Sequence, residues 1–488
     1  MATVTVVQGG KTRVFSALPA TALSDLLAEN GYAVSRPCGG RGTCGKCSAK
    51  IVYDEKSSRR TGTYLICQTL VTEDMTVYLQ ENQSMQIESH VKTGTSALPL
   101  EQTGLGVAVD IGTTTVVMQL YDRATGALLA ENAVLNPQTS VAADVVGRIE
   151  ASLNGKHKEL TRLITDALED SLEKVAKKAN TREKIQAMVI TGNTTMLYLL
   201  TGHPVDNLAR APFHADELFH RTAELLGQQV YLPPCISAFV GADISCAVMA
   251  SRMCEKDETA LLCDIGTNGE LALWHKGRLY VTSTAAGPAF EGVGISCGCA
   301  SITGAIDRVW EQEGRVAVHT IGEAEPAGLC GSGLIDAVAT LLRMEYLDET
   351  GAMDEPFHLS EKVSLQPKDI RQVQLAKAAI CGGIETLLAV AEISAADIEK
   401  IYLAGGFGSR LREESAISIG LIPAAFAGKT VALGNAALAG AVELLLYPEK
   451  QAQICSIAEN AQLVNLGGNP LFNERYIENI MFPFEETL

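Results

Sequence analysis

Residues 106–122 read GVAVDIGTTTVVMQLYD, and this stretch decides the fold because the chain contains its design twice. An apolar, β-branched run ends at Asp110, a turn of one glycine and three threonines follows, and a second apolar run begins. Residues 261–277, LLCDIGTNGELALWHKG, repeat this order with Asp264 in the place of Asp110. An internal repeat of this kind predicts two similar halves, each with two strands joined by a polar turn.

Each copy is followed by a second matching part. MVITGNTTML at 188–197 and IYLAGGFGSRL at 401–411 both run from an apolar strand through a glycine turn into an expected helix. Two such halves resemble the superfamily of acetate and sugar kinases, heat-shock chaperone ATPases and actin. The resemblance implies an α/β fold with a duplicated, ribonuclease-H-like core over residues 105–488. Its halves would cover about 105–255 and 256–488, with ATP between them.

The same resemblance assigns the candidate site residues. Asp110 and Asp264 would be catalytic, holding Mg2+ through water or orienting an attacking water. The two polar turns would face the phosphates of ATP, and a glycine pair would let the backbone approach the adenosine. The expected nucleotide-binding residues are Gly112, Thr113, Thr114, Thr115, Gly266, Thr267, Asn268, Gly405 and Gly406.

The N-terminal region carries a different chemistry in PCGGRGTCGKC, residues 37–47. Cys38, Cys44, Cys47 and Cys67 follow the spacing C-x5-C-x2-C-x19-C. Three thiolates in one glycine-rich loop are typical of an iron–sulfur cluster, since glycines let backbone N–H groups turn toward the sulfurs. A zinc knuckle is the alternative, but it pairs C-x2-C with a second such pair or with histidines, and the sequence offers neither partner.

The segments around this loop predict a small α+β domain. Residues 4–17 alternate around Gly9 and Gly10 like a hairpin, 21–31 read as a short helix capped by Thr21, and 48–53 and 69–80 read as strands. This order resembles the β-grasp ferredoxin with a [2Fe–2S] cluster, and the first gap of five is closer to the adrenodoxin-like spacing. We therefore expect a ferredoxin-like domain over 1–85 and a linker over 86–104.

The composition of the chain limits which partners and which cellular compartment we expect. The 488-residue chain has 57 acidic and 39 basic side chains, a net charge of −18, which disfavours nucleic acid as a partner. No stretch approaches about 20 uninterrupted apolar residues, and the first ten residues lack the order of a signal peptide. Thirteen scattered cysteines do not form a dense disulfide framework. We expect a cytoplasmic protein with no membrane partner.

Further motifs narrow the family. AGPAFEG at 286–292, GLCGSGLIDAVA at 328–339 and NPLFNERYIENIMFP at 469–483, joined to the ferredoxin-like domain, resemble the reductive activators of corrinoid-dependent enzymes. The resemblance implies one-electron transfer from the [2Fe–2S] cluster, with ATP, to the Co(II) corrinoid of a methyltransferase-system protein, restoring Co(I). It implies the corrinoid protein of a methyltransferase or O-demethylase system and an electron donor as partners, and leaves a homodimer open. The short linker leaves no room for the additional middle domain of the family, which we expect to be missing.

Two other functions stay open at this point. The first alternative is an activator of another low-potential metalloenzyme, such as the 2-hydroxyacyl-CoA dehydratases. The second is a small-molecule kinase with a fused redox sensor. Five residues are also undecided. Glu291 either contacts nucleotide or partner or is a solvated turn carboxylate; Asn193 and Asp243 either line the cleft or cap helices; Cys297 and Cys299 have a packing or a redox role.

Overall fold

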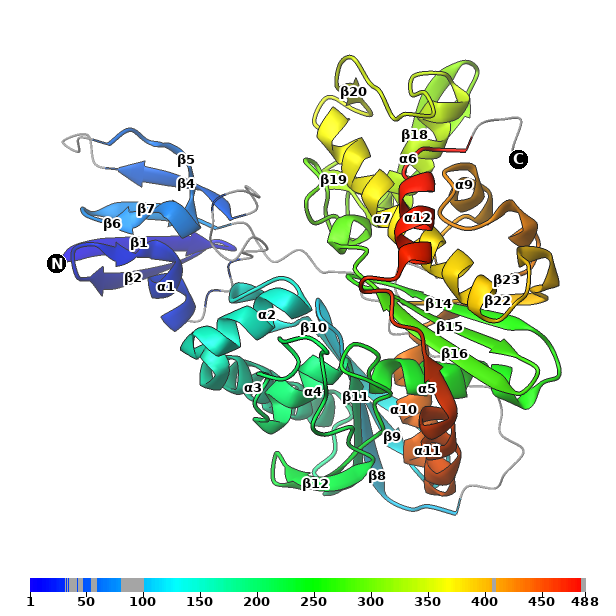
Figure 1. Ribbon diagram of the computed structural model, residues 1–488. Coiled ribbons are helices and arrows are strands. Elements are labelled where there is room, and N and C mark those ends of the chain that lie inside the picture. Colours follow the sequence, from blue (N-terminus) through cyan, green and yellow to red (C-terminus); the bar gives the residue numbers. More distant parts are fainter. Residues whose placement is uncertain are drawn as a thin grey trace. The chain divides into compact units, whose positions relative to one another are not determined.

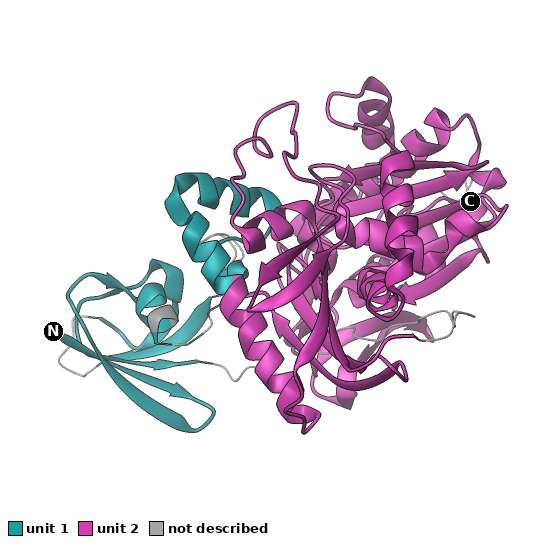
Figure 2. Ribbon diagram, turned by 90° about the horizontal axis from the view of Figure 1, so that it is seen from below, with its two compact units in different colours: residues 1–84, 137–163 teal, residues 85–136, 164–488 magenta. Residues whose placement is uncertain are grey.

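The computed structural model describes residues 1–30, 32, 34, 42, 47–53, 59–79, 101–405 and 410–483. The chain divides into two compact units, coloured separately in Figure 2. Unit 1 comprises residues 1–84 and 137–163, and unit 2 comprises residues 85–136 and 164–488.

Unit 1 contains a five-stranded sheet in the order β2-β1-β7-β4-β5. The hairpin predicted around Gly9 and Gly10 is confirmed, since β1 and β2 pair antiparallel and both glycines have positive φ. β1 is parallel to β7, so the sheet is mixed. Apolar residues of α1 pack into the same hydrophobic core as the buried residues of the sheet. The elements are β1 (Ala2–Gln8), β2 (Lys11–Ala17), β3 (Thr21–Ala22), α1 (Leu23–Glu29), β4 (Ser48–Tyr53), β5 (Gly62–Leu65), η1 (Ile66–Gln68), β6 (Leu70–Val71) and β7 (Met75–Tyr78).

Thr21 differs from its prediction. It was expected to cap the helix, but it lies in β3 and pairs with Val71 of β6, while its hydroxyl donates to the carbonyl of Leu18. Unit 1 also includes η2 (Pro137–Ser140), α2 (Val145–Ala151), η3 (Ser152–Lys156) and the first residues of α3 (His157–Lys178).

The first half of unit 2 contains a six-stranded sheet in the order β10-β9-β8-β11-β13-β12. β8, β9 and β10 form an antiparallel meander, β11 is parallel to β8, and β13 is parallel to β11. Every residue of β8 is buried except Asp110, which is half-buried near the carboxyl end of the strand. The elements are β8 (Leu105–Ile111), β9 (Thr115–Asp122), β10 (Ala127–Leu135), β11 (Ile185–Gly192), α4 (Thr194–Thr201), β12 (Arg221–Leu225), β13 (Gln228–Leu232) and α5 (Ala242–Ser251).

The second half repeats the meander and the two parallel strands beside it, in a sheet of order β23-β22-β14-β15-β16-β24. β14, β15 and β16 form the meander, β22 is parallel to β14, and β23 is parallel to β22. The predicted duplication is confirmed, because β14 takes the place of β8 and β22 that of β11. The elements are β14 (Ala260–Ile265), β15 (Gly269–His275), β16 (Arg278–Thr284), β22 (Lys400–Ala404), β23 (Thr430–Gly434), α10 (Ala436–Leu446) and β24 (Ala461–Leu463).

Equivalent helices of the two halves, α5 and α10, lie side by side (Figure 1). The two helices approach each other closely at Gly440, where an added Cβ would lie 2.3 Å from the carbonyl oxygen of Cys246. One hydrophobic core surrounds the pair and contains residues of both sheets, among them Val189 and Leu262.

The second half has additional elements around α7, and a second core fills the space between them and the sheet. α7 is long and apolar enough to cross a membrane, and 78% of its most apolar window is buried inside the structure. The elements are η5 (Pro288–Glu291), β17 (Ala305–Gln312), β18 (Arg315–Thr320), β19 (Gly328–Leu329), α6 (Gly331–Arg343), β20 (Phe357–His358), β21 (Ser364–Leu365), α7 (Pro367–Val390), α9 (Glu413–Ser418), α11 (Gln451–Asn460) and α12 (Pro470–Glu478).

Candidate nucleotide and cluster sites

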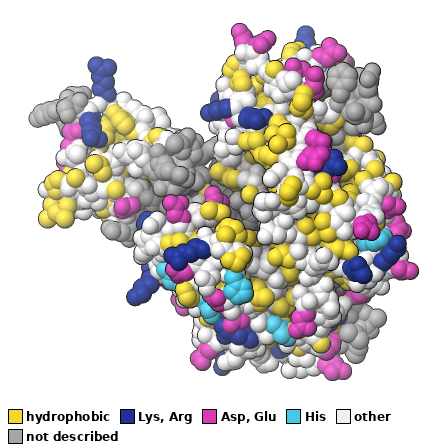
Figure 3. Space-filling view, viewed as in Figure 1, with side chains coloured by type: hydrophobic (Ala, Val, Ile, Leu, Met, Phe, Trp, Pro, Cys, Tyr) yellow, Lys and Arg dark blue, Asp and Glu magenta, His cyan; other side chains and the backbone are white. Residues whose placement is uncertain are grey.

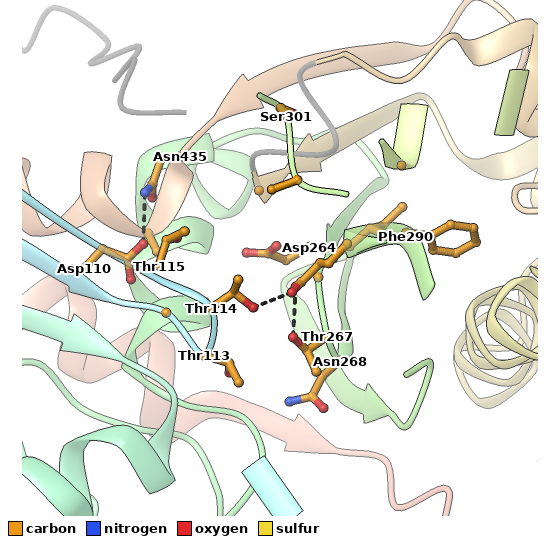
Figure 4. Close-up of a pocket in the computed structure, with 18 of the residues that line it drawn as sticks. Asp110, Thr113, Thr114, Thr115, Asp264, Thr267, Asn268, Phe290, Ser301 and Asn435 are labelled. Carbon is orange, nitrogen blue, oxygen red and sulfur yellow. Dashed lines mark hydrogen bonds between the residues drawn. The ribbon is translucent and has the colours of Figure 1, made fainter. Parts of the chain in front are cut away.

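A cavity of about 560 Å³ lies within unit 2, between the two strand-turn-strand repeats. Asp110, near the end of β8, and Asp264, near the end of β14, both line it, as Figure 4 shows. The duplication explains the arrangement, since equivalent strands bring equivalent carboxylates to one space. Six carboxylate side chains line the cavity, and Arg410 is the one basic residue among its described lining.

The first polar turn, between β8 and β9, is held in shape by Asn136. Its amide Nδ2 donates to the carbonyl of Gly112 at 2.8 Å, and its backbone N–H donates to the carbonyl of Thr114 at 2.9 Å. The second turn, between β14 and β15, closes on itself, because the N–H of Gly266 donates to the carbonyl of Asn268 at 3.0 Å. Both turns therefore present threonine side chains to the cavity.

Glu291, the last residue of η5, joins the two turns. Thr114 Oγ1 donates to one carboxylate oxygen of Glu291, and Thr267 Oγ1 donates to the other at 2.9 Å. Both hydrogen bonds are drawn as dashed lines in Figure 4. Glu291 is therefore not a solvated turn carboxylate, and its contacts in the structure are with the two predicted phosphate turns.

Asp110 has a partner from the other half. Asn435 Nδ2 donates to Asp110 Oδ2 at 2.9 Å, while Asn435 Oδ1 accepts the N–H of Leu438 at 2.8 Å. The second bond makes Asn435 the N-cap of α10, so its amide is oriented by the helix that it begins. Asp243 stands near the same point of the equivalent helix α5, in its first turn, and also lines the cavity.

Burial raises the proton affinity of four acids that line the cavity, and in three of them the charges of neighbouring acids add to this effect. Burial raises the pKa of Asp110 to about 6, opposed by the hydrogen bond from Asn435. Burial, with the charges of Asp110 and Glu291, raises the pKa of Asp264 to about 7. Burial, with Asp110 and Asp264, raises the pKa of Asp243 to about 8, and the pKa of Glu270 is raised in the same way. A cation in this cavity would relieve the repulsion.

Asn193 caps a helix and also lines the cavity, so both of the roles left open by the sequence apply to it. Its Oδ1 accepts the N–H of Thr195 at 3.1 Å at the start of α4. Its Nδ2 is buried and has no hydrogen-bond partner among the described residues. A buried donor of this kind is satisfied by an acceptor oxygen, which water or a ligand phosphate supplies.

Gly405 follows β22 with a φ of +83°, and a Cβ there would lie 2.7 Å from Asp264 Oδ1. Glycine is required both by the backbone conformation and by this close approach. The structure thus brings together all the predicted cavity residues that it describes; Gly406 lies outside the described residues. The described set is Asp110, Gly112, Thr113, Thr114, Thr115, Asp264, Gly266, Thr267, Asn268 and Gly405.

Sequence reasoning missed Asn435 and Glu270. LGNAAL around Asn435 repeats the position of VGADIS around Asp243, each following the last parallel strand of a half, and that match was the available signal. The sequence signal for Glu270 is weaker, because Glu270 only follows the second turn directly. In the structure, Glu270 lies on β15 and pairs with Asp264 on β14.

Two of the four predicted cluster ligands, Cys47 and Cys67, are among the described residues. The backbone joins their segments, because the N–H of Ile66, the residue before Cys67, donates to the carbonyl of Cys47 at 2.9 Å. Gln68 Nε2 lies 3.7 Å from Cys67 Sγ, and an added Cβ on Gly42 would lie 3.0 Å from the Gln68 side chain. An iron–sulfur cluster is consistent with these two thiols, with the Gln68 amide as a donor to sulfur, and with the closely packed Gly42 of the loop. Cys38 and Cys44 lie outside the described residues.

The remaining described cysteines lie away from the predicted cluster loop in the sequence. Burial raises the pKa of Cys235 to about 12, as expected for a core thiol. Cys299 lines the cavity, and Cys297 Sγ lies 3.9 Å from the carbonyl of Lys362. Within the described ranges, no group of three or more His, Cys, Asp or Glu side chains is placed to hold a metal ion unaided. A cation in the cavity would therefore need water or ligand oxygens as well.

Comparison with known proteins matches three family models to this chain. Residues 6–72 match the family model of the 2Fe-2S iron-sulfur cluster binding domain, 105–256 that of the RACo middle region, and 258–488 that of the C-terminal domain of RACo, the ASKHA domain. The expectation that the middle region is missing was therefore wrong. It corresponds to residues 105–256, which were expected to form the first half of the repeat.

Individual relatives cover most of the chain. A corrinoid activation enzyme, RamQ, of Eubacterium limosum is 34% identical over 421 residues, covering 77% of this chain and 70% of that protein. A [Co(II) methylated amine-specific corrinoid protein] reductase of Methanosarcina barkeri is 26% identical over 336 residues, covering 60% and 62%. The solved structure of a reductive activator for corrinoid, iron-sulfur protein matches with a TM-score of 0.72 and 25% identity over 99% and 98% of the two chains.

Proposed function

The chain belongs to the RACo family of corrinoid activation proteins, and on that premise we propose that it is an ATP-dependent reductive activator of a corrinoid protein. The observation that carries the proposal is the combination, in one chain, of a cluster-binding domain with a two-turn acidic cavity. Neither a kinase nor a simple ferredoxin requires both.

The proposed reaction moves one electron. The substrate is the Co(II) corrinoid of a methyltransferase-system protein, which gains the electron and becomes Co(I); an external donor protein replaces that electron. A [2Fe–2S] cluster supplies one-electron chemistry when bound. Cys38, Cys44, Cys47 and Cys67 would hold it, and Gln68 would donate to the sulfur of Cys67.

Nucleotide binding is proposed to make this transfer favourable. Co(I) is a strong reductant, and a gap of about 200 mV would cost roughly 4–5 kcal/mol for one electron. ATP contributes only through its different affinity for two conformations of the activator and its partner. Two halves that meet around one cavity are suited to such a change, since closure on a ligand is a common motion of hinged halves.

In this proposal the threonines of both turns donate to the phosphates, and the buried Nδ2 of Asn193 donates to a phosphate oxygen. Asp110 and Asp264 hold Mg2+ through water, which agrees with a lining rich in carboxylates that need additional oxygen ligands. Gly405 and Gly406 admit the adenosine. Asn435 keeps the carboxylate of Asp110 directed into the cavity.

We also propose the domain division 1–85, 86–104 and 105–488, with a boundary between halves near residue 255. The limits of the matching family models, 6–72, 105–256 and 258–488, support it. A cytoplasmic location is proposed because the thirteen cysteines are scattered through a large chain and do not form the dense disulfide framework of a secreted domain.

The test is anaerobic mixing of the reduced protein with Co(II) corrinoid proteins, with and without Mg-ATP, followed by absorption spectroscopy. We expect the Co(I) band to appear faster and to a greater extent with Mg-ATP. Corrinoid proteins that stay Co(II) with reduced, cluster-loaded protein and Mg-ATP would refute the proposal. Stoichiometric phosphorylation of a small molecule would instead favour the kinase alternative.

A further inference from the structure

The carboxylate of Glu291 occupies the space between the two polar turns. It accepts one hydrogen bond from Thr114 of the first half and one from Thr267 of the second. An added Cβ on Gly266 would lie 3.4 Å from Glu291 Oε1, so the carboxylate lies directly over the second turn. A single acidic side chain thus makes polar contacts with both halves.

These contacts conflict with the proposed role of the threonines. A threonine hydroxyl has one hydrogen and donates one hydrogen bond at a time. While Thr114 and Thr267 donate to Glu291, neither donates to a phosphate. The negative charge of Glu291 also repels phosphate. Glu291 and the nucleotide phosphates therefore exclude each other at these two hydroxyls.

The side chain of Glu291 has freedom that its backbone lacks. Phe290 is buried in the core of the second half, and Gly292 packs so closely on Cys299 that an added Cβ would lie 2.6 Å from its backbone nitrogen. Anchors on both sides hold the backbone in place. The carboxylate can leave the turns only by rotation of the side chain, which needs no rearrangement of the fold.

Resting on the proposed function, we propose that Glu291 is an internal competitor for the phosphate site. In the nucleotide-free protein its carboxylate ties Thr114 to Thr267, and Mg-ATP binds by displacing it. The tie stabilises the nucleotide-free arrangement of the two halves and weakens apparent nucleotide affinity by the fraction of molecules in which the hydroxyls are occupied. Displacement frees the halves to move relative to each other.

The test compares Glu291→Gln and Glu291→Ala with the wild type, using the full cluster-loaded chain and Mg-AMP-PNP as the probe in calorimetry. We expect a Kd lower by roughly threefold to tenfold in both variants, because the competing anion is gone. The melting temperature without nucleotide should fall, since the tie is lost. The matched control is Glu325→Gln, the same change at a carboxylate whose side chain is 87% exposed, and its Kd should equal that of the wild type.

Other outcomes are decisive in the opposite direction. An unchanged or higher Kd in Glu291→Gln, with tight binding by the wild type, overturns the competitor role. Lost ATP hydrolysis at unchanged affinity would do the same and would assign Glu291 to the attacking water. A cluster-loaded wild type that binds no Mg-AMP-PNP would remove the proposed function, and with it this inference. Glu291→Gln preserves the size of the side chain and keeps the test valid if Glu291→Ala fails to fold.

Discussion

Asp264 is an acid surrounded by other acids, and this determines how the nucleotide-free protein responds to pH. Its pKa is raised to about 7 from an ordinary value of 3.8 by burial and by the charges of Asp110 and Glu291. The folded protein therefore binds this proton more tightly than the unfolded chain. The associated stability is complete below about pH 4 and is lost as the pH rises through about 7. Asp110 and Asp243 act in the same direction.

The first prediction concerns Asp264→Asn. Without nucleotide, the free energy of unfolding of the wild type should decrease between pH 5 and pH 8, and the variant should show a smaller decrease. At pH 8 the variant should be more stable than the wild type by roughly 2 kcal/mol, less than the full shift at 1.36 kcal/mol per unit because cavity water screens the charge. Urea unfolding at several pH values measures this. The control is Asp354→Asn on the exposed surface; equal pH slopes in the wild type and Asp264→Asn would contradict the prediction.

The second prediction separates the two roles of Asn435. Asn435→Ala should cost about 1 kcal/mol of stability through loss of the α10 N-cap, whereas Asn435→Ser keeps a capping hydroxyl. In the wild type, the hydrogen bond from Asn435 lowers the pKa of Asp110, and both variants lose this donor. The acid limb of the ATPase pH profile should therefore move to higher pH in both. A wild-type profile in Asn435→Ser, measured at saturating Mg-ATP, would show that the bond to Asp110 has no role in the reaction.

Single residues also show what sequence reasoning can and cannot supply. Asp110 and Asp264 were predictable because each is followed by the same turn, within a few positions. Glu291 was left undecided because its partner Thr114 lies 177 residues away, and no local pattern reports that contact. Asn435 was missed because the repeat aligns it with Asp243 only after the strand order is known.

The elements were predictable wherever a local pattern was strong. Apolar runs with polar turns predicted the first two strands of each meander, and the glycine pair predicted the first hairpin. The prediction that Thr21 caps the helix was wrong, because its segment pairs with β6, a strand about 50 residues further along the chain. This pairing replaces the helix cap. The crossing of α5 and α10 was not predictable, because a contact between two buried helices leaves no period in either sequence.

The third prediction concerns that crossing. Gly440→Ala should destabilise unit 2 by roughly 1–3 kcal/mol, because a Cβ would lie within 2.6 Å of three backbone atoms of Cys246 and would push the helices apart. Displacement of α10 should also move its N-cap Asn435, so Mg-ATP affinity should fall. Thermal unfolding and calorimetry measure both effects. Gly467→Ala, where the nearest atom is the side-chain oxygen of Asn465 at 3.2 Å, is the control; a variant as stable as this control would contradict the close packing.

The whole molecule combines two chemistries whose described residues belong to different units. All described residues that line the cavity belong to unit 2, and the two described cluster cysteines belong to unit 1. The net charge of −18 does not gather into one patch on the face shown in Figure 3, where described acidic side chains are scattered among neutral and basic ones. Charge alone therefore does not identify a docking surface on that face, and the separation of the two sites becomes the feature to test.

The fourth prediction follows from this separation. Cys67→Ser should abolish the [2Fe–2S] absorption spectrum and Co(I) formation, and it should leave the Kd for Mg-AMP-PNP within about twofold of the wild type, since no cavity residue depends on it. Asp264→Asn should show the reverse: an intact cluster spectrum, weaker Mg-nucleotide binding, and Co(I) formation that no longer responds to ATP. Anaerobic spectroscopy and calorimetry on the same preparations give both readouts. If Asp264→Asn kept full ATP stimulation, nucleotide would act elsewhere than in this cavity; if Cys67→Ser still produced Co(I) from the same donor, the electron would not pass through the N-terminal cysteines.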